Sequence, residues 1–449
     1  MEIVVKPGSL SANQLTIKGL IVGCLIMLLL IPALFITNLV EERANRQEEV
    51  AIEVSSKWAT AQTIAGPVLV IPYHDIVKSS EGKVTVYKKT AYFLPDQLDI
   101  NGTVKPEIRH RSIFNIVVYN SDLRISGSFP ALKFEELNLQ PENILFNEAR
   151  IYFGLSDFRG IEDQLNLSWD NASLPFNAGV PDNEIITNGL SAPVAVNAET
   201  ASASHQFNLK LHLRGSERLY FIPAGKTTTV NINSSWTNPS FDGNFLPVTS
   251  PEVTAKGFAA DWKIQHLNRN YPQSWKDTKY DISNSAFGVK LLQPVDSYGK
   301  TKRSVKYAIL FIALTFSVYF FIEILQKRYV HPVQYVLVGL ALCIFYTLLL
   351  SIGEYLVFNL AYTIAASATI LLITLYTKSL FAKWKTALLF GSFLAFLYGF
   401  IFILIQLQDG ALLFGSIGLF LLLAVIMYYS RRIDWRGQAN ANAGASLQT

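Results

Sequence analysis

The sequence predicts a mixed membrane protein with six transmembrane α-helices, one N-terminal and five C-terminal, and a large, mostly β extracytoplasmic domain between them. Three observations predict this fold class. Of the 449 residues, 50% are apolar and only 16% are charged, whereas soluble domains have roughly 25% charged residues. Six apolar runs are long enough for a bilayer core, which needs about 20 helical residues. The stretch between the first two runs instead alternates apolar and polar side chains, which is typical of half-buried strands.

The first element is a transmembrane signal anchor at residues 19–40, preceded by a predicted cytoplasmic N-terminus at residues 1–18. A cleavable signal peptide has a shorter apolar stretch and a cleavage site of small residues. This run instead passes directly into Glu41, Glu42 and Arg43. We therefore expect the segment to stay in the protein as a membrane-spanning helix.

Residues 41–304 form the predicted outer domain, which begins with a helical stalk. Apolar residues recur at spacings of three and four between residues 40 and 58, so the helix should continue beyond the membrane. We expect Gly66-Pro67 to end this helix, because neither residue favours its continuation.

The rest of the outer domain is predicted to be β. Residues 207–213 alternate most clearly, with apolar side chains on one face and polar side chains on the other. Turn signals such as Asn101-Gly102 and Asp242-Gly243 separate the predicted strands. Many short strands separated by such turn signals favour an antiparallel sandwich or rolled sheet, built as one large unit or as two smaller ones.

Five closely spaced apolar runs predict a transmembrane helix bundle over residues 305–429, followed by a cytoplasmic tail at residues 430–449. The loops after the second, fourth and sixth spans contain Lys and Arg, whereas the alternate loops contain Glu354 and Asp409 and neither Lys nor Arg. Positively charged loops remain in the cytoplasm. This pattern places both termini in the cytoplasm and residues 41–304 outside it. The five predicted spans are residues 305–325, 333–352, 355–376, 386–407 and 411–429.

The net charge of +4 agrees with this topology. Residues 41–304 contain 27 Lys and Arg against 29 Asp and Glu, a balance of −2, so the remaining residues account for +6. A nucleic-acid partner is not expected, because the outer domain has no basic excess. Both cysteines, Cys24 and Cys343, lie in apolar runs, so the outer domain has no disulfide framework.

No catalytic, cofactor or metal-binding signature is present. Gly225-Lys226-Thr227 resembles the end of a phosphate-binding loop, but Tyr220 occupies the position where that loop requires glycine. The six histidines are scattered, and on one strand His205 and His212 would face opposite sides. We therefore expect no enzyme activity, no cofactor and no metal site.

Five polar residues in the bundle are candidates for helix packing or for a substrate pathway. Glu323 lies in the last turn of the second span and Glu354 at the junction of the third and fourth spans, so an interfacial position explains both. Asn359, Thr363 and Ser367 are spaced by four and form a polar stripe on the fourth span. Small polar residues on one face favour close helix packing with interhelical hydrogen bonds, and a substrate pathway is the alternative.

Motifs distributed along the chain resemble those of the CreD family of inner-membrane proteins. They include Gly66-Pro67, Arg214-Gly215-Ser216-Glu217, Pro239-Ser240-Phe241-Asp242-Gly243, Leu291-Leu292-Gln293-Pro294-Val295-Asp296, His331-Pro332-Val333-Gln334-Tyr335 and Arg431-Arg432-Ile433-Asp434-Trp435. The sequence departs from the family pattern at Gly353-Glu354-Tyr355, where Ser-Glu-His is expected, and at Gln408, where Glu is common. The resemblance implies an inner-membrane protein with a periplasmic domain, linked to envelope integrity and stress response. It implies no catalytic residues.

Two functions follow as hypotheses. The first is a non-enzymatic envelope protein whose periplasmic domain binds a partner or an envelope component, with the bundle as anchor and transmitter. The second is a transporter or lipid-handling protein that uses the bundle. The expected partners are the lipid bilayer and an unidentified envelope protein or component, and a homo-oligomer is compatible with the sequence.

Overall fold

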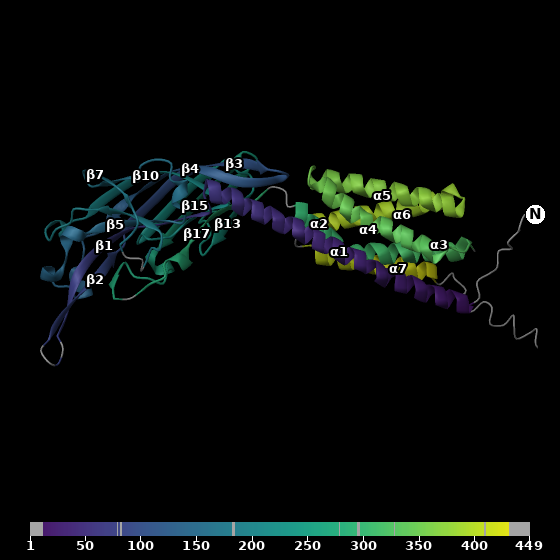
Figure 1. Cartoon of the computed structure of the whole chain (residues 1–449), viewed down its shortest axis with the longest axis horizontal. Coiled ribbons are helices and arrows are strands. Elements are labelled where there is room, and N and C mark those ends of the chain that lie inside the picture. The colour runs from purple at the N-terminus through teal and green to yellow at the C-terminus, as the bar shows by residue number, and fades with distance from the viewer. Residues whose placement is uncertain are drawn as a thin grey trace, which may run out of the picture. The chain divides into compact units, whose positions relative to one another are not determined.

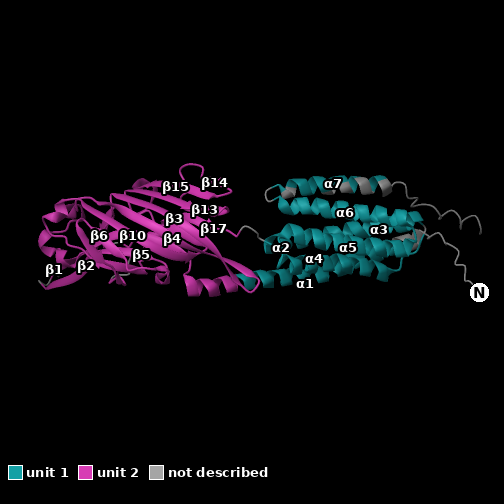
Figure 2. Ribbon diagram, turned by 90° about the horizontal axis from the view of Figure 1, so that it is seen from above, with its two compact units in different colours: residues 1–48, 295–449 teal, residues 49–294 magenta. Residues whose placement is uncertain are grey.

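The computed structural model describes residues 12–78, 80, 83–181, 185–277, 279–293, 297–326, 328–407 and 410–430. Most of the two predicted cytoplasmic segments, residues 1–18 and 430–449, therefore lies outside the described residues. The chain divides into two compact units, one of residues 1–48 and 295–449 and one of residues 49–294 (Figure 2). The β-rich part is thus one unit, and its bounds are somewhat narrower than the predicted domain at residues 41–304.

The β-rich unit contains two sheets, and several of their strands are labelled in Figure 1. The first has nine strands, in the order β13-β17-β11-β1-β5-β9-β8, with β2 paired to β1 and β16 paired to β2. Its strands are β1 (Gln62–Lys78), β2 (Val84–Phe93), β5 (Arg150–Leu155), β8 (Asn177–Ala178), β9 (Gly189–Pro193), β11 (Arg218–Phe221), β13 (Pro239–Gly243), β16 (Ser274–Lys276) and β17 (Phe287–Leu291).

The second sheet has eight strands, in the order β14-β15-β12-β3-β4-β10-β6-β7. Strands β1 and β11 pair in parallel, as do β12 and β3. The other described strand pairs of the two sheets are antiparallel. The strands of this sheet are β3 (Gln97–Arg111), β4 (Phe114–Phe129), β6 (Asn166–Trp169), β7 (Ala172–Pro175), β10 (His205–Ser216), β12 (Thr227–Ser234), β14 (Glu252–Thr254) and β15 (Gly257–Gln265).

Buried side chains from both sheets pack into one hydrophobic core. The prediction for residues 207–213 is confirmed, because β10 buries every second side chain along that stretch. Large rings fill the centre, and burying each contributes roughly 1.5–3 kcal/mol to stability. The largest fully buried side chains of this core include Trp262, Phe129, Phe153, Phe221 and Phe287.

Two predicted boundaries are wrong in this unit. The stalk helix ends at Trp58, before Gly66-Pro67, which instead lies inside β1 where the register with β5 shifts between Ala65 and Val68. Glycine and proline fit such a bulge, since the extra residue leaves the hydrogen-bonded ladder. Asn101-Gly102 forms no turn, because it lies inside β3.

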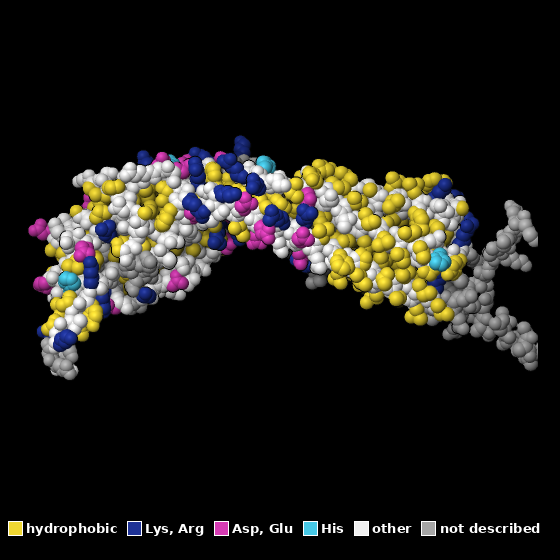
Figure 3. All heavy atoms as spheres, in the orientation of Figure 1, with side chains coloured by type: hydrophobic (Ala, Val, Ile, Leu, Met, Phe, Trp, Pro, Cys, Tyr) yellow, Lys and Arg dark blue, Asp and Glu magenta, His cyan; other side chains and the backbone are white. Residues whose placement is uncertain are grey.

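The helical unit contains most of α1 (Ala12–Trp58) and six further helices. These are α2 (Ser297–Lys306), α3 (Ala308–Gln326), α4 (Pro332–Gly353), α5 (Phe358–Phe381), α6 (Trp384–Gln406) and α7 (Ala411–Ser430). Within the part of the chain that the structure describes, five helices are long and apolar enough to cross a membrane: α1, α3, α4, α5 and α6. Helix α7 has nearly the range of the sixth predicted span but is not one of those five, so six spans stay a prediction. Apolar side chains cover the visible flank of this unit (Figure 3).

The predicted extension of the first helix is confirmed. Helix α1 has 47 residues, which corresponds to a length of about 70 Å at 1.5 Å per residue. A bilayer core of about 30 Å accounts for less than half of that length. Residues 49–58 of this helix belong to the β-rich unit.

Candidate functional site

Glu323 forms a buried ion pair with a residue far away in the sequence. Its carboxylate pairs with the ammonium group of Lys18 on α1, and Glu323 is completely buried. The same carboxylate accepts hydrogen bonds from the backbone N–H of Val330 and from Tyr335 Oη, both at 2.8 Å. Lys18 Nζ also donates to the carbonyl oxygen of Val330 at 2.8 Å and lies 3.9 Å from the ring centroid of Tyr329. The position in the last turn of α3 agrees with the sequence, whereas the partner on α1 was not expected.

Glu354 lies at the C-cap of α4, with a side chain that is 12% exposed. Its Oε1 lies 3.8 Å from Arg43 Nε on α1 and accepts a hydrogen bond of 3.4 Å from Tyr298 Oη on α2. Burial and the negative charge of Glu354 raise the pKa of Tyr298 to about 12, so the hydroxyl stays protonated and remains a donor. These three residues, the Glu354 cluster, connect α1, α2 and α4.

Asn359 belongs to a short chain of hydrogen bonds between three helices. Lys300 Nζ on α2 donates to Gln406 Oε1 on α6 at 3.0 Å, and Gln406 Nε2 donates to Asn359 Oδ1 on α5 at 2.6 Å. All of these groups are exposed. Asn359 therefore makes an interhelical hydrogen bond at the surface of the bundle.

Thr363 and Ser367 lie on the exposed face of α5, which corrects their predicted role in packing. The hydroxyl of Thr363 donates to the carbonyl oxygen of Asn359 on the same helix, at 2.8 Å. Each helical residue is turned by about 100° from the one before. Residues two positions after those of the polar stripe are therefore turned by about 200° and face the bundle. The side chains of α5 that pack inward include Ala361, Ala365, Ala366 and Thr369.

In the β-rich unit, the end of α1 is held by five residues that sequence analysis did not single out. We call this group the stalk anchor: Ser56, Trp58, Thr60, Asp157 and Arg159. Asp157 accepts hydrogen bonds from the N–H and hydroxyl of Thr60 at 2.9 and 3.1 Å, and from Arg159 Nε and Nη2 at 2.9 and 2.8 Å. Arg159 also donates to the backbone carbonyl oxygen of Ser56, in the last turn of α1.

Electrostatics strengthen the stalk anchor at two points. Burial alone would raise the pKa of Asp157, but the Arg159 guanidinium and the Thr60 amide outweigh it and hold this pKa well below its usual range. Two further guanidinium groups, from Arg109 and Arg214, lie 4.7 and 4.6 Å from the ring of Trp58. Such cation–π contacts contribute roughly 0.5–2 kcal/mol each, depending on how far they are removed from water.

Comparison with known proteins gives the family of this chain. A family model described as "Inner membrane protein CreD" matches residues 14–436. The chain belongs to the CreD family. Inner membrane protein CreD of Escherichia coli (strain K12) is 32% identical to it over 416 residues, which cover 91% of each chain. Together with the five apolar helices, this membership identifies a multi-pass protein of the inner membrane.

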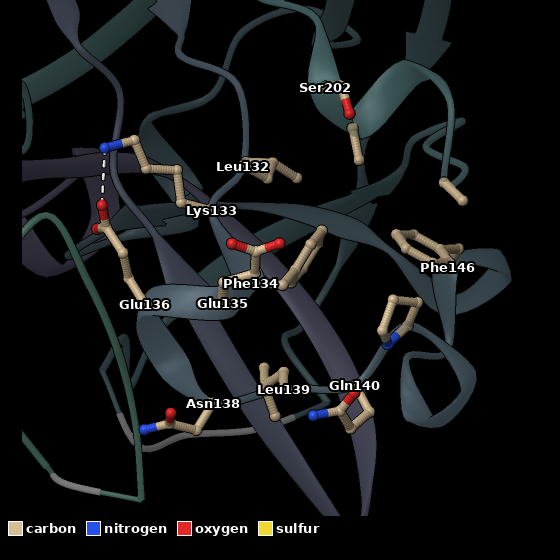
Figure 4. Close-up of a pocket in the computed structure, with 13 residues that line it drawn as sticks. Leu132, Lys133, Phe134, Glu135, Glu136, Asn138, Leu139, Gln140, Phe146 and Ser202 are labelled. Atoms are coloured by element: carbon tan, nitrogen blue, oxygen red, sulfur yellow. Dashed lines mark hydrogen bonds and ion pairs between the residues drawn. The ribbon is translucent and has the colours of Figure 1, made fainter.

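One pocket of this CreD-family chain lies beside the short 3₁₀ helix at Phe134–Leu137 and has a volume of about 720 Å³ (Figure 4). Apolar side chains such as Phe134 and Phe146 line part of it, and at its rim Lys133 and Glu136 form an exposed ion pair of 2.7 Å. The hydroxyl of Ser202 also lines the pocket, but no histidine or cysteine does.

Titratable residues do not gather into a metal site in the described ranges, where no three His, Cys, Asp or Glu side chains lie together. The two histidines compared above behave as their strand positions predict. His205 is buried and His212 is exposed, on opposite faces of β10. The absence of a metal or cofactor in the CreD-family protein stays a prediction.

Proposed function

We propose that this protein is a non-enzymatic component of envelope integrity and stress response. In this proposal it spans the inner membrane six times, keeps both termini in the cytoplasm, and binds an envelope component or partner through the β-rich unit in the periplasm. Helix α1 transmits the bound state to the bundle. Family membership supports the location in the inner membrane. The contacts of α1 support a route for transmission.

The observation that carries the proposal is that α1 is held by ionic groups near each of its ends. In the helical unit, Lys18 is paired with Glu323, and Arg43 lies near Glu354. In the β-rich unit, Arg159 binds the last turn of α1 through Ser56. A helix used only as an anchor would need apolar packing and no such contacts at its extramembrane end.

Transport through the bundle is the weaker alternative. The polar stripe that suggested a pathway is exposed on α5, and aromatic rings fill the space between α3, α4 and α6. Phe311, Phe345, Tyr346 and Tyr398 form one cluster there, with ring centroids 4.5–6.1 Å apart. Packed rings of this kind occupy the space that a substrate pathway at this point of the bundle would need.

Breaking α1 between its contacts tests the proposal. Asn45 is exposed within the helix, so Asn45→Pro removes one backbone hydrogen bond and kinks α1 without removing a buried side chain. We expect this variant to reach normal abundance but to fail to complement a strain that lacks the gene, scored as survival under envelope stress. Asn45→Ala is the matched control and should complement. Full complementation by Asn45→Pro would refute transmission through α1.

Cross-linking in intact cells tests the binding part. A photoreactive side chain in the β-rich unit should capture a specific envelope protein or component, and the yield should change when cells are stressed. A unit that captures nothing at rest or under stress would argue against a binding function.

A further inference from the structure

A polar depression on the exposed face of the eight-stranded sheet contains a sequence feature that the proposed function does not explain. Asn101-Gly102, a strong turn signal, lies inside the 15-residue strand β3. Asparagine and glycine are depleted in strands. A local sequence that conflicts with the fold is expected at functional sites, where the side chains serve another purpose than stability.

One row of side chains crosses four strands at this point. In register order it consists of Asn231 on β12, Asn101 on β3, Arg124 on β4 and Lys210 on β10. Asn231 Nδ2 donates to Asn101 Oδ1 at 2.9 Å. Arg124 and Lys210 are direct cross-strand partners, and like charges in that position are destabilising. Among the residues that the structure describes, no carboxylate lies within 4.0 Å of either cation.

The next row along the same strands consists of Asn233, Thr103, Asp122 and His212. Asp122 is the acidic residue of this row, but its carboxylate already contacts two other side chains. Oδ2 accepts from Lys105 Nζ at 2.6 Å and Oδ1 lies 2.7 Å from His212 Nδ1. These two bonds lower the pKa of Asp122, so it stays ionised and compensates Lys105 rather than the Arg124 and Lys210 pair.

The two rows line a pocket of about 420 Å³, with Gly102 and Leu123 between them. This volume lies within the range of roughly 300–1,000 Å³ that is usual for small-ligand sites. A Cβ atom on Gly102 would overlap the Leu123 side chain and lie 2.9 Å from the carbonyl oxygen of Asp122. Gly102 therefore faces the core side of the sheet, where the buried Leu123 side chain occupies the place that a Cβ would take. Except for Leu123, the lining side chains are amides, a hydroxyl, an imidazole and charged groups.

We propose that this depression binds a saccharide that carries a carboxylate or phosphate group. The anion lies between Arg124 and Lys210 and relieves their repulsion, since both are strong donors to such oxygens. The amides of Asn101, Asn231 and Asn233 each offer donors and an acceptor, which match the hydroxyls of a sugar ring. This inference rests on the proposed function only for the source of the ligand, which is the envelope component bound in the periplasm.

Calorimetric titration of the full chain in phospholipid nanodiscs tests the inference with four probes. They are tetragalacturonate, glucose 1-phosphate, the neutral maltotetraose and inorganic phosphate. The first two distinguish a carboxylated glycan from a phosphorylated sugar, and we expect at least one of them to bind about ten-fold or more tightly than maltotetraose and inorganic phosphate. Equal affinity for inorganic phosphate, equal affinity for maltotetraose, or no binding of either charged saccharide would overturn the inference.

Arg124→Gln and Lys210→Gln should each weaken binding of the charged saccharide about ten-fold or more, because each loses a charge-assisted hydrogen bond. The matched control is Lys263→Gln, an exposed lysine on β15 outside the pocket, which should bind normally. Neither pocket variant should lower the melting temperature without ligand, because each removes a like-charge contact. Unchanged affinity in both variants would overturn the site. These binding results are independent of the Asn45→Pro complementation, so either proposal can fail without the other.

Discussion

Removing Lys18 should destabilise the helical unit strongly, because its partner Glu323 is completely buried. Taking one partner from a buried ion pair typically costs about 3–5 kcal/mol, since the remaining charge has no compensation. In Lys18→Met, Glu323 keeps two hydrogen bonds, from the Val330 N–H and from Tyr335 Oη. We therefore expect the lower end of that range, about 3 kcal/mol.

A double-mutant cycle separates the ion pair from general disturbance of packing. Glu323→Gln alone leaves the Lys18 ammonium group with the Val330 carbonyl oxygen and the ring of Tyr329. In the double variant Lys18→Met with Glu323→Gln, neither charge remains, and the Gln side chain can still accept a hydrogen bond. The two single effects should therefore exceed the double effect by at least about 2 kcal/mol.

The assay is unfolding of the full chain in mixed micelles by a denaturing detergent, followed by loss of helical circular dichroism. Lys57→Met is the matched control on the same helix, because Lys57 forms an exposed pair with Glu53 and its loss should have no measurable effect. The reasoning is refuted if Lys18→Met stays within about 0.5 kcal/mol of the wild type, the usual range for surface substitutions. Additive single effects would also refute it.

Three further predictions follow from the topology, the stalk anchor and α5. In a chain without its native cysteines, Tyr355→Cys should react with an impermeant maleimide in intact cells and Lys383→Cys should not; the reverse pattern would contradict the predicted orientation. Because the folded pKa of Asp157 is depressed, its stabilising effect is present above the unfolded value of about 4 and is lost as the pH falls below it. Asp157→Asn should remove this pH dependence and about 2 kcal/mol of stability at pH 7 in urea unfolding, and an unchanged acid profile would count against the anchor. Thr363→Val and Ser367→Ala should each change stability by less than about 0.5 kcal/mol in the detergent assay, and a larger loss would show that these exposed hydroxyls make contacts.

The elements that sequence analysis predicts well are those whose signal is local. Apolar runs place the five candidate spans, and alternation along residues 207–213 identifies β10. The stalk helix is also correct, because its spacing of three and four is a local pattern. Each of these features depends on which face of one element is buried, which the order of side chains determines directly.

The residues that sequence analysis missed depend on partners far away in the chain. In the sequence, Lys18 is a charged residue that flanks a span. Only the fold brings it to Glu323, 305 positions later. Asp157 likewise meets Thr60 across 97 positions. No periodic pattern in the sequence indicates such a pair. The two residues do end apolar runs on the same predicted side of the membrane, which is a reason to test for an ion pair.

The helix-end signal at Gly66-Pro67 and the turn signal at Asn101-Gly102 fail for different physical reasons. Gly66-Pro67 lies at a register shift between β1 and β5, so the backbone itself accounts for both residues. At Asn101-Gly102 there is no such irregularity, because β3 pairs with β4 without a register shift from Gln97 to Arg111, and with β12 from Gln97 to Val104. Packing explains Gly102, because the Leu123 side chain leaves no room for a Cβ, but it does not explain Asn101. The remaining explanation for Asn101 is its side chain, which lies on the exposed face in the same row as the like charges of Arg124 and Lys210.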